Sequence, residues 1–476
     1  IQWDKDFGGT KFDGLSSILP SIDGGYLFCG LTTSDSTGNV TQNPKGTYDF
    51  WILKTDLNGN KLWDRRYGGS NANVLTSADK TFDGGYILAG YSNSNIGGDK
   101  SQPCWGAEDY WVIKIDSLGN KQWDKRFGGT SSDALFSVKQ CKDSGYILGG
   151  YSYSGIGGDK TQPNFFATFS YPDYWVVKID NSGNKEWDKT FGGTGYDELI
   201  ALQQSDDEGF ILGGISQSGI SGNKTEPNWD ITNNTFDYWI IKIDSVGNKQ
   251  WERDYGGFDE EYKFKDIVKT NDKGYFMSGI SASGIGGDKT ESNLGYYQTW
   301  ALKIDSVGNI EWDKTVLSTN SDGAGFGAGN YEYGVSCLQS SDGCYVLANY
   351  SPSGIGGYKT QPNWDTTNFS PDYWIVKFCD TTTQTSVAVN EISSSEITIY
   401  PNPFLNDFAL TITGKNSSDI TICIYNLLGE IVFNQKEIIS GNRFSTKINM
   451  IDFAKGIYLV EIKEDEKRAV KKIIKQ

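Results

Sequence analysis

The chain has 476 residues and a net charge of −17 at neutral pH, and it contains no histidine. Such an acidic chain argues against nucleic-acid binding, which needs a basic stripe. The absence of histidine excludes Ser-His and Cys-His nucleophile pairs and histidine zinc sites. No run of 18 apolar residues is present, so the sequence predicts no membrane-spanning segment.

One phrase recurs along residues 1–380 and decides the predicted fold. WDKxFGG or a variant of it begins about every sixty residues, at Trp3, Trp63, Trp123, Trp187, Trp251 and Trp312. Phrases of the GGYILAG and DYWIIKID types each occur six times as well. A fixed period of this size is typical of stacked or radially arranged supersecondary units.

Each repeat predicts four short strands and no helix. In residues 187–251, four short apolar or alternating segments are separated by turns rich in Gly, Asn and Asp. Six such units predict an all-β fold, a six-bladed β-propeller. The sixth unit ends near Asp380 without its own WDK strand, and the first begins with a spare one. We therefore expect the N-terminal strand to complete the last blade, which the alternative of an open solenoid would not explain.

The repeats also resemble a known family. GGTSSDALFSVKQCKDSGYILGGYSYS and DYWVVKIDNSGNKEWDKTFGG resemble the Bacteroidetes-type SBBP β-propeller repeat, and the resemblance covers residues 1–380. It implies a fold but no activity, because that family has no common function. Function therefore has to be argued from sites.

The C-terminal part has a different pattern. Residues 381–395 are mostly polar and are predicted to form a linker. Residues 396–476 contain alternating apolar segments with Gly and Asn turns, which predict a small Ig-like β-sandwich.

Several phrases of this second domain resemble the type A C-terminal sorting domain of the type IX secretion system. They are IYPNPF, IYNLLGEIV, GIYLVEI and the basic end KKIIKQ. The resemblance implies export across the outer membrane of a Bacteroidetes-like bacterium, with the secretion machinery as partner, followed by release or surface attachment. The matching residues are Pro401, Asn402, Pro403, Gly429, Gly456, Tyr458, Lys471 and Lys472. The start of the chain, IQWDKDFGG, has the appearance of a mature N-terminus after signal removal.

The loops between the second and third strands are expected to share one face of the ring and follow the pattern SGIGGDKTQPNW. Exposed aromatic side chains there would stack on sugars or anchor a protein partner, and the alternative is that each packs as a lid on its own blade. The candidates are Trp105, Phe165, Trp229 and Trp364. The aspartate of GGDK permits a Ca²⁺ hypothesis, although one aspartate per loop is few ligands, and turn contacts are the alternative. No other cofactor is expected.

Carboxylates near the start of the first strands are expected at the top of the central channel. They are Asp13, Asp133, Asp197, Asp259 and Glu332. Paired carboxylates can hydrolyse glycosides, but a ring of equivalent acids more often caps turns, so we assign no catalytic residue.

Two covalent features are also predicted. Cys337 and Cys344 flank a predicted hairpin turn and are candidates for a disulfide. An Asp-Ser/Thr-apolar pattern resembles the O-glycan acceptor pattern of Bacteroidetes, although a type I turn initiated by Asp explains its occurrences in hairpin turns equally. The candidate acceptors are Ser36, Ser117, Ser245, Ser306, Thr366 and Thr381.

Together these patterns predict an exported, non-enzymatic surface or extracellular protein. The loop face of its propeller would bind a glycan or a protein, and its tail would direct secretion. Two alternatives remain: a self-associating structural subunit of an extracellular assembly, and a secreted glycan-active enzyme that uses the channel carboxylates.

Overall fold

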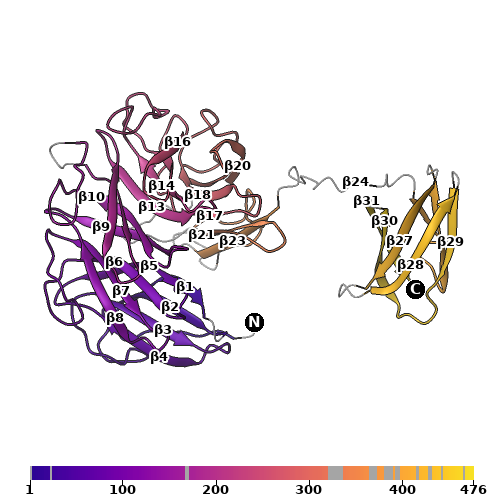
Figure 1. Cartoon of the computed structure of the whole chain (residues 1–476), viewed down its shortest axis with the longest axis horizontal. Helices are drawn as coiled ribbons and strands as arrows, with labels where there is room; N and C mark the ends of the chain where they lie inside the picture. Colours follow the sequence, from indigo (N-terminus) through magenta and orange to yellow (C-terminus); the bar gives the residue numbers. More distant parts are fainter. Residues whose placement is uncertain are drawn as a thin grey trace. The chain divides into compact units, whose positions relative to one another are not determined.

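The computed structural model describes residues 3–21, 24–166, 171–319, 336–363, 372–379, 390–391, 397–413, 417–426, 431–440, 443–464 and 467–476. It divides into two compact units, Ile1–Cys379 and Asp380–Gln476 (Figure 1). Every regular element in these ranges is a strand, which confirms the predicted all-β fold. In the described part of the chain, no helix is long and apolar enough to cross a membrane.

Within the described residues, the first unit consists of six consecutive antiparallel sheets, here called blades 1 to 6. Blade 1 contains β1 (Asp13–Pro20), β2 (Tyr26–Thr32), β3 (Asp49–Thr55) and β4 (Lys61–Tyr67). Blade 2 contains β5 (Asn73–Lys80), β6 (Tyr86–Ser92), β7 (Asp109–Ile115) and β8 (Lys121–Phe127). Blade 3 contains β9 (Asp133–Gln140), β10 (Tyr146–Ser152), β11 (Asp173–Ile179) and β12 (Lys185–Phe191).

The later blades follow the same order. Blade 4 contains β13 (Asp197–Gln204), β14 (Phe210–Ser216), β15 (Asp237–Ile243) and β16 (Lys249–Tyr255). Blade 5 contains β17 (Asp266–Lys269), β18 (Tyr275–Ser281), β19 (Gln298–Ile304) and β20 (Ile310–Val316). Blade 6 has three described strands, β21 (Ser336–Gln339), β22 (Tyr345–Ser351) and β23 (Asp372–Phe378).

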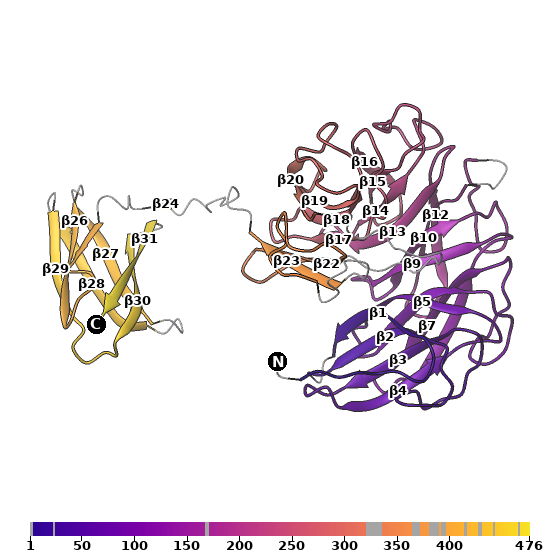
Figure 2. The ribbon, with the colours of Figure 1, turned by 180° about the vertical axis from the view of Figure 1, so that it is seen from behind.

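The blades pack face to face around their first strands. Each first strand contacts the first strand of the next blade, from β1 to β21, and Figure 2 shows these strands on the inner side of the array. All seven residues of β7, β11, β15 and β19 are buried. In blades 2 to 5 the tryptophan of the third strand packs on an aromatic ring of the preceding blade, as Trp175 does on Tyr110 at 4.7 Å between ring centroids. The repeated DYWIIKID phrase therefore forms the core between blades.

The N-terminal copy of the repeated WDKxFGG segment contacts blade 1, as predicted for a fourth strand of the preceding blade, but it does not pair with blade 6. Residues 3–9 contact blade 1 as each fourth strand contacts the next blade: the Asn39 N–H donates to the Gly8 carbonyl at 2.8 Å, and the Gly8 N–H donates to Asn39 Oδ1 at 3.2 Å. Trp3 donates its Nε1–H to the Leu57 carbonyl at 2.9 Å. However, residues 3–9 form no strand ladder, so they do not pair with β23 in this structure.

The two faces that a closed ring would bury are open. Ile375 on β23 is 68% exposed, whereas its equivalents Ile52 and Val112 are fully buried. On β1, Leu15 and Ile18 are 59% and 53% exposed, although the equivalent side chains on β5 are buried. Ring closure therefore stays a prediction.

Closure can be tested by cross-linking, because blade 1 supplies the register. There Ile52 pairs with Arg65, so Ile375 should face Lys5. We expect Lys5→Cys with Ile375→Cys to cross-link within one chain through a short bismaleimide, whereas Lys5→Cys with the distant Val246→Cys should not. Cross-links only between chains would instead indicate strand exchange, and equal yields from both pairs would contradict the register.

The second unit is a sandwich of two sheets. The five-stranded sheet has the order β24 (Asn390–Glu391), β31 (Lys467–Lys475), β30 (Gly456–Glu464), β27 (Ser417–Tyr425) and β28 (Ile431–Ser440). The three-stranded sheet contains β25 (Ile397–Tyr400), β26 (Asp407–Thr413) and β29 (Arg443–Asn449). Phe408, Leu410, Ile422, Val460 and Ile473 are buried between the sheets, as expected for alternating strands. Of the predicted linker 381–395, only residues 390–391 are described.

Candidate functional site

The GGDK element joins neighbouring blades. The Asp99 N–H of blade 2 donates to the Gly68 carbonyl at the end of blade 1 at 2.8 Å, and the Gly68 N–H donates to Asp99 Oδ2 at 3.0 Å. Asp159 and Asp288 repeat this double link, and Asn223 repeats it through its amide oxygen. Over the described ranges, no group of three or more Cys, Asp or Glu side chains could hold a metal ion. The turn-contact alternative therefore accounts for the element, and Ca²⁺ binding stays a hypothesis.

The lysine of the same element is buried below the tryptophan of the third strand. Lys100, Lys160, Lys224 and Lys289 each lie 5.6–5.8 Å from the centre of that ring. Burial lowers the pKa of Lys160 and of Lys289 to about 8. These lysines are internal cations of the scaffold.

Of the predicted channel carboxylates, Asp133 and Asp197 are fully buried between blades, and Asp13 is half-buried. Asp133 accepts hydrogen bonds from the Gly129 N–H at 2.6 Å and the Ser154 hydroxyl at 2.9 Å. Asp197 is bound in the same way, and Asp13 accepts the Gly9 N–H at 2.7 Å. The prediction is therefore wrong for Asp133 and Asp197, because the glycine turn that precedes each of them binds its carboxyl group inside the blade junction.

In blade 5 a different acid from the predicted one occupies the buried position. In blade 5 the equivalent residue is Glu261, which accepts the Gly257 N–H at 3.0 Å, and not Asp259, whose own N–H is bound by Ser283 Oγ. Glu332 lies outside the described residues.

Each buried acid has a second acid close by, at the start of the third strand of the preceding blade. Asp109 and Asp133 flank the Gly128–Gly129 pair: a Cβ on Gly128 would approach Asp109 Oδ1 to 2.1 Å, while Gly129 binds Asp133. Burial raises the pKa of Asp109 to about 7, and the charge of Asp133 adds to the shift. The first glycine of the pair is thus required by the close approach of Asp109, and the second by that of Ser154, whose Cβ would lie 2.4 Å from an added Cβ.

The same arrangement recurs at the next two junctions. Burial and the neighbouring acid raise the pKa of Asp173, beside Asp197, to about 8. They also raise the pKa of Glu261, beside Asp237, to about 8. Asp133, Asp173 and Asp237 each have a buried Oδ1 without a hydrogen-bond partner. A shared proton would satisfy such paired oxygens.

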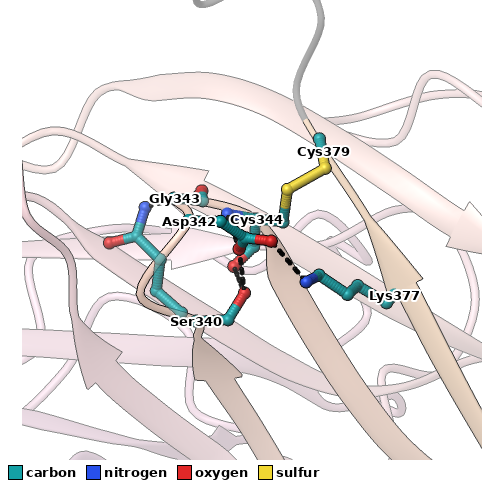
Figure 3. Close-up of a disulfide and its surroundings, with 7 residues drawn as sticks. Ser340, Asp342, Gly343, Cys344, Lys377 and Cys379 are labelled. Atoms are coloured by element: carbon teal, nitrogen blue, oxygen red, sulfur yellow. Dashed lines mark hydrogen bonds and ion pairs between the residues drawn. A yellow bond between two sulfur atoms is a disulfide. The ribbon is translucent and has the colours of Figure 1, made fainter. Parts of the chain in front are cut away.

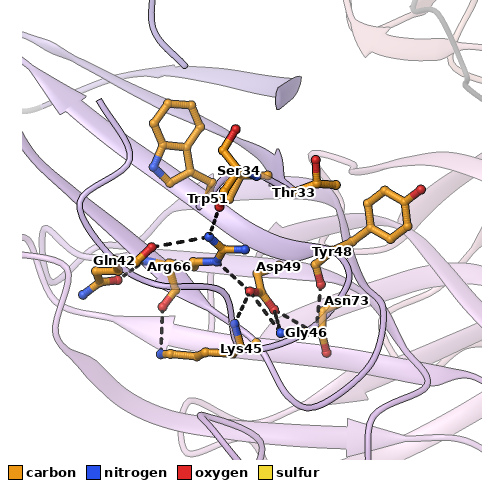
Figure 4. A network of polar contacts seen from close by, with 12 residues as sticks. Thr33, Ser34, Gln42, Lys45, Gly46, Tyr48, Asp49, Trp51, Arg66 and Asn73 are labelled. Carbon is orange, nitrogen blue, oxygen red and sulfur yellow. Dashed lines mark hydrogen bonds and ion pairs between the residues drawn. The ribbon is translucent and has the colours of Figure 1, made fainter. Parts of the chain in front are cut away.

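The junction between blades 1 and 2 replaces one acid by an amide. Asn73 occupies the position of Asp133 and donates Nδ2–H to Asp49 Oδ1 at 3.2 Å (Figure 4). Arg66 donates its Nε–H to Asp49 Oδ2 at 2.6 Å and is fully buried. At this junction the neutral amide of Asn73 therefore replaces the second acid, and Arg66 compensates the charge of the remaining one, Asp49.

The described loop aromatic residues are partly exposed, and each packs on the next blade and not on its own as the lid alternative predicted. Trp105, Phe165 and Trp229 are 57%, 37% and 38% exposed. Each donates its backbone N–H to the aspartate that begins the third strand and lies over a glycine of the next blade. Arg126 lies 4.7 Å from the centre of the Trp105 ring, and Trp229 Nε1–H donates to Asp288 at 2.8 Å. Trp364 lies outside the described residues.

A repeated exposed isoleucine in these loops was not predicted. The isoleucine that precedes Gly-Gly, or Ser-Gly in blade 4, is 64–68% exposed in blades 2 to 6. These residues are Ile96, Ile156, Ile220, Ile285 and Ile355. Their repetition was visible in the sequence, but their orientation depends on the tight turn that follows, which bonds Gly157 to Lys160 in both directions.

The disulfide prediction was wrong in its pairing. Cys344 bonds to Cys379, and Cys337 is a buried free thiol (Figure 3). Tyr345 pairs with Phe378, so Cys344 and Cys379 extend the same ladder, whereas Cys337 pairs with Leu347. In other blades this end of the third strand enters a hairpin to the fourth strand; in blade 6 the disulfide links this end of β23 to the start of β22.

The O-glycan acceptors stay predictions. Ser117, Ser245 and Ser306 are exposed at hairpin turns, where the preceding aspartate accepts backbone N–H groups; Asp116 Oδ1, for example, accepts those of Leu118 and Asn120. Ser36 is exposed, and its hydroxyl donates to the Thr41 carbonyl at 3.1 Å. Thr366 and Thr381 lie outside the described residues.

Most of the predicted sorting residues lie around the last strand. The segment from Pro401 to Pro403 binds β31 through Asn402 Oδ1, which accepts the Ile474 N–H at 2.9 Å. The Tyr458 hydroxyl donates to the Ala454 carbonyl at 2.7 Å. Gly456 begins β30, Lys471 and Lys472 belong to β31, and Gly429 lies outside the described residues.

These features define the class of the protein: an all-β protein of the β-propeller type, built from repeated four-stranded blades and followed by a small sandwich. Residues 398–476 match the secretion system C-terminal sorting domain. The protein is therefore secreted or attached to the cell surface through the type IX route of Bacteroidetes.

Other similarities are weaker. The regulatory protein FlaEY of Caulobacter vibrioides is 26% identical over 178 residues, which cover 36% of this chain and 19% of that protein. The chain thus spans less than a fifth of this curated relative. A mutant apocarotenoid oxygenase of Synechocystis is 13% identical over 62% of this chain and 60% of its own, with a TM-score of 0.33. A GH43 β-xylosidase/α-arabinofuranosidase from a compost metagenome is 14% identical, with a TM-score of 0.29. The match covers 64% of this chain and 90% of that enzyme.

Proposed function

We propose that this protein is an exported binding or adhesion protein that holds a glycan or protein partner on the loop face of its propeller. The observation that carries the proposal is the repeated apolar surface of that face, where the five isoleucines and the half-exposed aromatic rings recur from blade to blade. Exposed apolar groups at equivalent positions are typical of interaction surfaces. The sorting domain and a disulfide suit an extracellular protein.

The enzyme alternative has less support. Asp133 and Asp197 have no exposed surface, and Asp133 Oδ2 and both carboxylate oxygens of Asp197 accept hydrogen bonds from serine hydroxyls and glycine N–H groups. A glycosidase needs two carboxyl groups that reach the substrate. The proposal therefore assigns these acids to the scaffold.

Replacing Trp105 and Trp229 by alanine together is expected to weaken binding at least tenfold, which corresponds to about 1.4 kcal/mol. The measurement is binding of labelled protein to a glycan array and to Bacteroidetes cells. Leu118→Ala is the control, because Leu118 is exposed in the hairpin turn between β7 and β8 and should not affect binding. Unchanged binding of the double variant would contradict the proposal, and concentration-dependent assembly without any binding would favour a structural subunit.

A further inference from the structure

The repeats diverge where blades 3 and 4 meet on the loop face. Tyr196 stands where blade 3 has Ser132, and Gln217 stands where blade 5 has Ala282. Tyr153 occupies the position of Asn93 in blade 2. Because blades 2 and 3 fold with Ala72 and Ser132 at the Tyr196 position, and blade 5 folds with Ala282 at the Gln217 position, the larger side chains are not needed by the scaffold.

A cavity of about 210 Å³ opens at this junction. Its side chains are Tyr171 from the β10–β11 loop, Thr194 from the β12–β13 connection, and Gln217, Asn233 and Asn234 from the β14–β15 loop. Gly195 and Gly219 complete the lining and leave backbone accessible. None of the lining residues carries a charge.

The amides in this cavity are held in place by the loop itself. Asp230 Oδ2 accepts the Asn234 N–H at 2.9 Å, and Gln217 Nε2–H donates to the Asn234 carbonyl at 3.1 Å. Asn233 has a φ of 54°, a left-handed conformation that asparagine tolerates better than most residues. This conformation lays its amide over Gly219, where a Cβ would meet it at 2.9 Å.

Aromatic rings continue from the cavity toward the inner strands. Gly195 is followed by Tyr196, whose ring lies 5.6 Å from that of Phe236 and whose hydroxyl donates to Glu198 Oε2 at 3.0 Å. Tyr151 and Tyr153 lie edge to face at 5.8 Å on the blade 3 side. Such rings offer flat apolar faces with polar edges.

The lining chemistry selects one class of ligand. An anion would need basic groups and a cation would need free carboxylates, and the lining contains neither. An apolar ligand would need a mostly apolar wall. Amide and hydroxyl groups that both donate and accept, beside aromatic rings, match a molecule with many neutral hydroxyl groups.

We infer that this cavity binds a neutral sugar residue of a polysaccharide, with Gln217, Asn233 and Thr194 bonding its hydroxyl groups. Tyr171 of the lining, together with Tyr196, which follows the lining residue Gly195, would offer the aromatic faces that pack on the sugar ring. The inference rests on the proposed function and names its ligand class. It places specificity in the divergent residues of one junction, while the repeated loop residues supply general adhesion.

The test uses the full chain and a glycan array of neutral, acidic and amino sugars, with a peptide array alongside. Gln217→Ala and Tyr196→Ser install residues that blades 5 and 3 already have, so folding should be retained, and unfolding midpoints check this. We expect wild type to bind neutral glycans and each variant to bind them at least tenfold more weakly. Asn181→Ala, in the exposed hairpin of blade 3, is the matched control and should bind as wild type does.

The outcomes separate the two proposals. Neutral-glycan binding that survives both cavity variants but is lost in the Trp105→Ala, Trp229→Ala double variant would overturn the cavity and leave the proposed function standing. A preference for peptides or acidic glycans would also overturn the inferred ligand class. Failure to bind any array or any cell would overturn both proposals.

Discussion

Raising the pH from about 5 to about 8 is expected to destabilise the propeller. The acids at the blade junctions have pKa values raised by burial, to about 7 for Asp109 and about 8 for Asp173 and Glu261. The folded state therefore holds protons that the unfolded chain, whose carboxyl pKa values lie near 4, has already released. The stability they contribute is fully present below about pH 4 and is lost as the pH rises through about 7 to 8.

The expected slope is about 1.4 kcal/mol per pH unit for each such proton. Above about pH 8 the trend should weaken, because burial lowers the pKa of Lys160 to about 8 and this shift acts in the opposite direction. Denaturant unfolding at a series of pH values measures the slope directly.

Asp133→Asn tests the origin of this effect. It copies Asn73, which accepts the Ser92 and Ser94 hydroxyls at 2.7 and 3.0 Å and also donates to Asp49. We expect a flatter pH profile and higher stability at about pH 8, because one of two paired acids is gone. The exposed Asp35→Asn should leave the profile unchanged. An Asp133→Asn profile as steep as that of wild type would show that the paired acids are not responsible.

Removing the disulfide is expected to have the other large effect. Cys344 and Cys379 are 35 residues apart, and a loop of this length corresponds to about 3–4 kcal/mol of stabilisation. Cys379→Ser should therefore lower the stability of blade 6, where the bond links the start of β22 to the end of β23. Urea unfolding with and without reductant provides the measurement.

Cys337→Ala is the control for this experiment, because Cys337 is a free buried thiol. A non-reducing peptide map of this variant should still show the Cys344–Cys379 disulfide. Its stability should fall only modestly, because the substitution shortens one buried side chain. A linked Cys337–Cys344 peptide, or a reductant effect that persists in Cys379→Ser, would contradict the structure.

The fold was predictable because the repeated sequence indicates the strands, the turns between them and the number of blades. The strand period, the glycine turns and the six copies of DYWIIKID together predict blades whose third strands are buried, as β7 and β11 are. Closure by residues 3–9 was predicted from counting alone. The structure shows their bonds to blade 1 but no ladder with β23, so this part of the prediction is not confirmed.

The sites were less predictable, since the repeat pattern gives the position of a residue on a blade but not the direction in which its side chain points. Asp133 was assigned to the channel, yet the glycine pair beside it turns its carboxyl into the junction. Asn73 was the informative departure, because an amide in a position otherwise held by acids indicates that charge there is costly. The Gln217 cavity required the conformation of Asn233, which no sequence pattern reports.

The central claim is that the repeated residues form the scaffold and the divergent residues form the site. The most direct test measures neutral-glycan affinity and unfolding free energy together for Tyr196→Ser and Asp133→Asn. We predict that Tyr196→Ser loses affinity at unchanged stability and that Asp133→Asn changes the pH dependence of stability at unchanged affinity. A loss of affinity in Asp133→Asn, with full affinity in Tyr196→Ser, would contradict it.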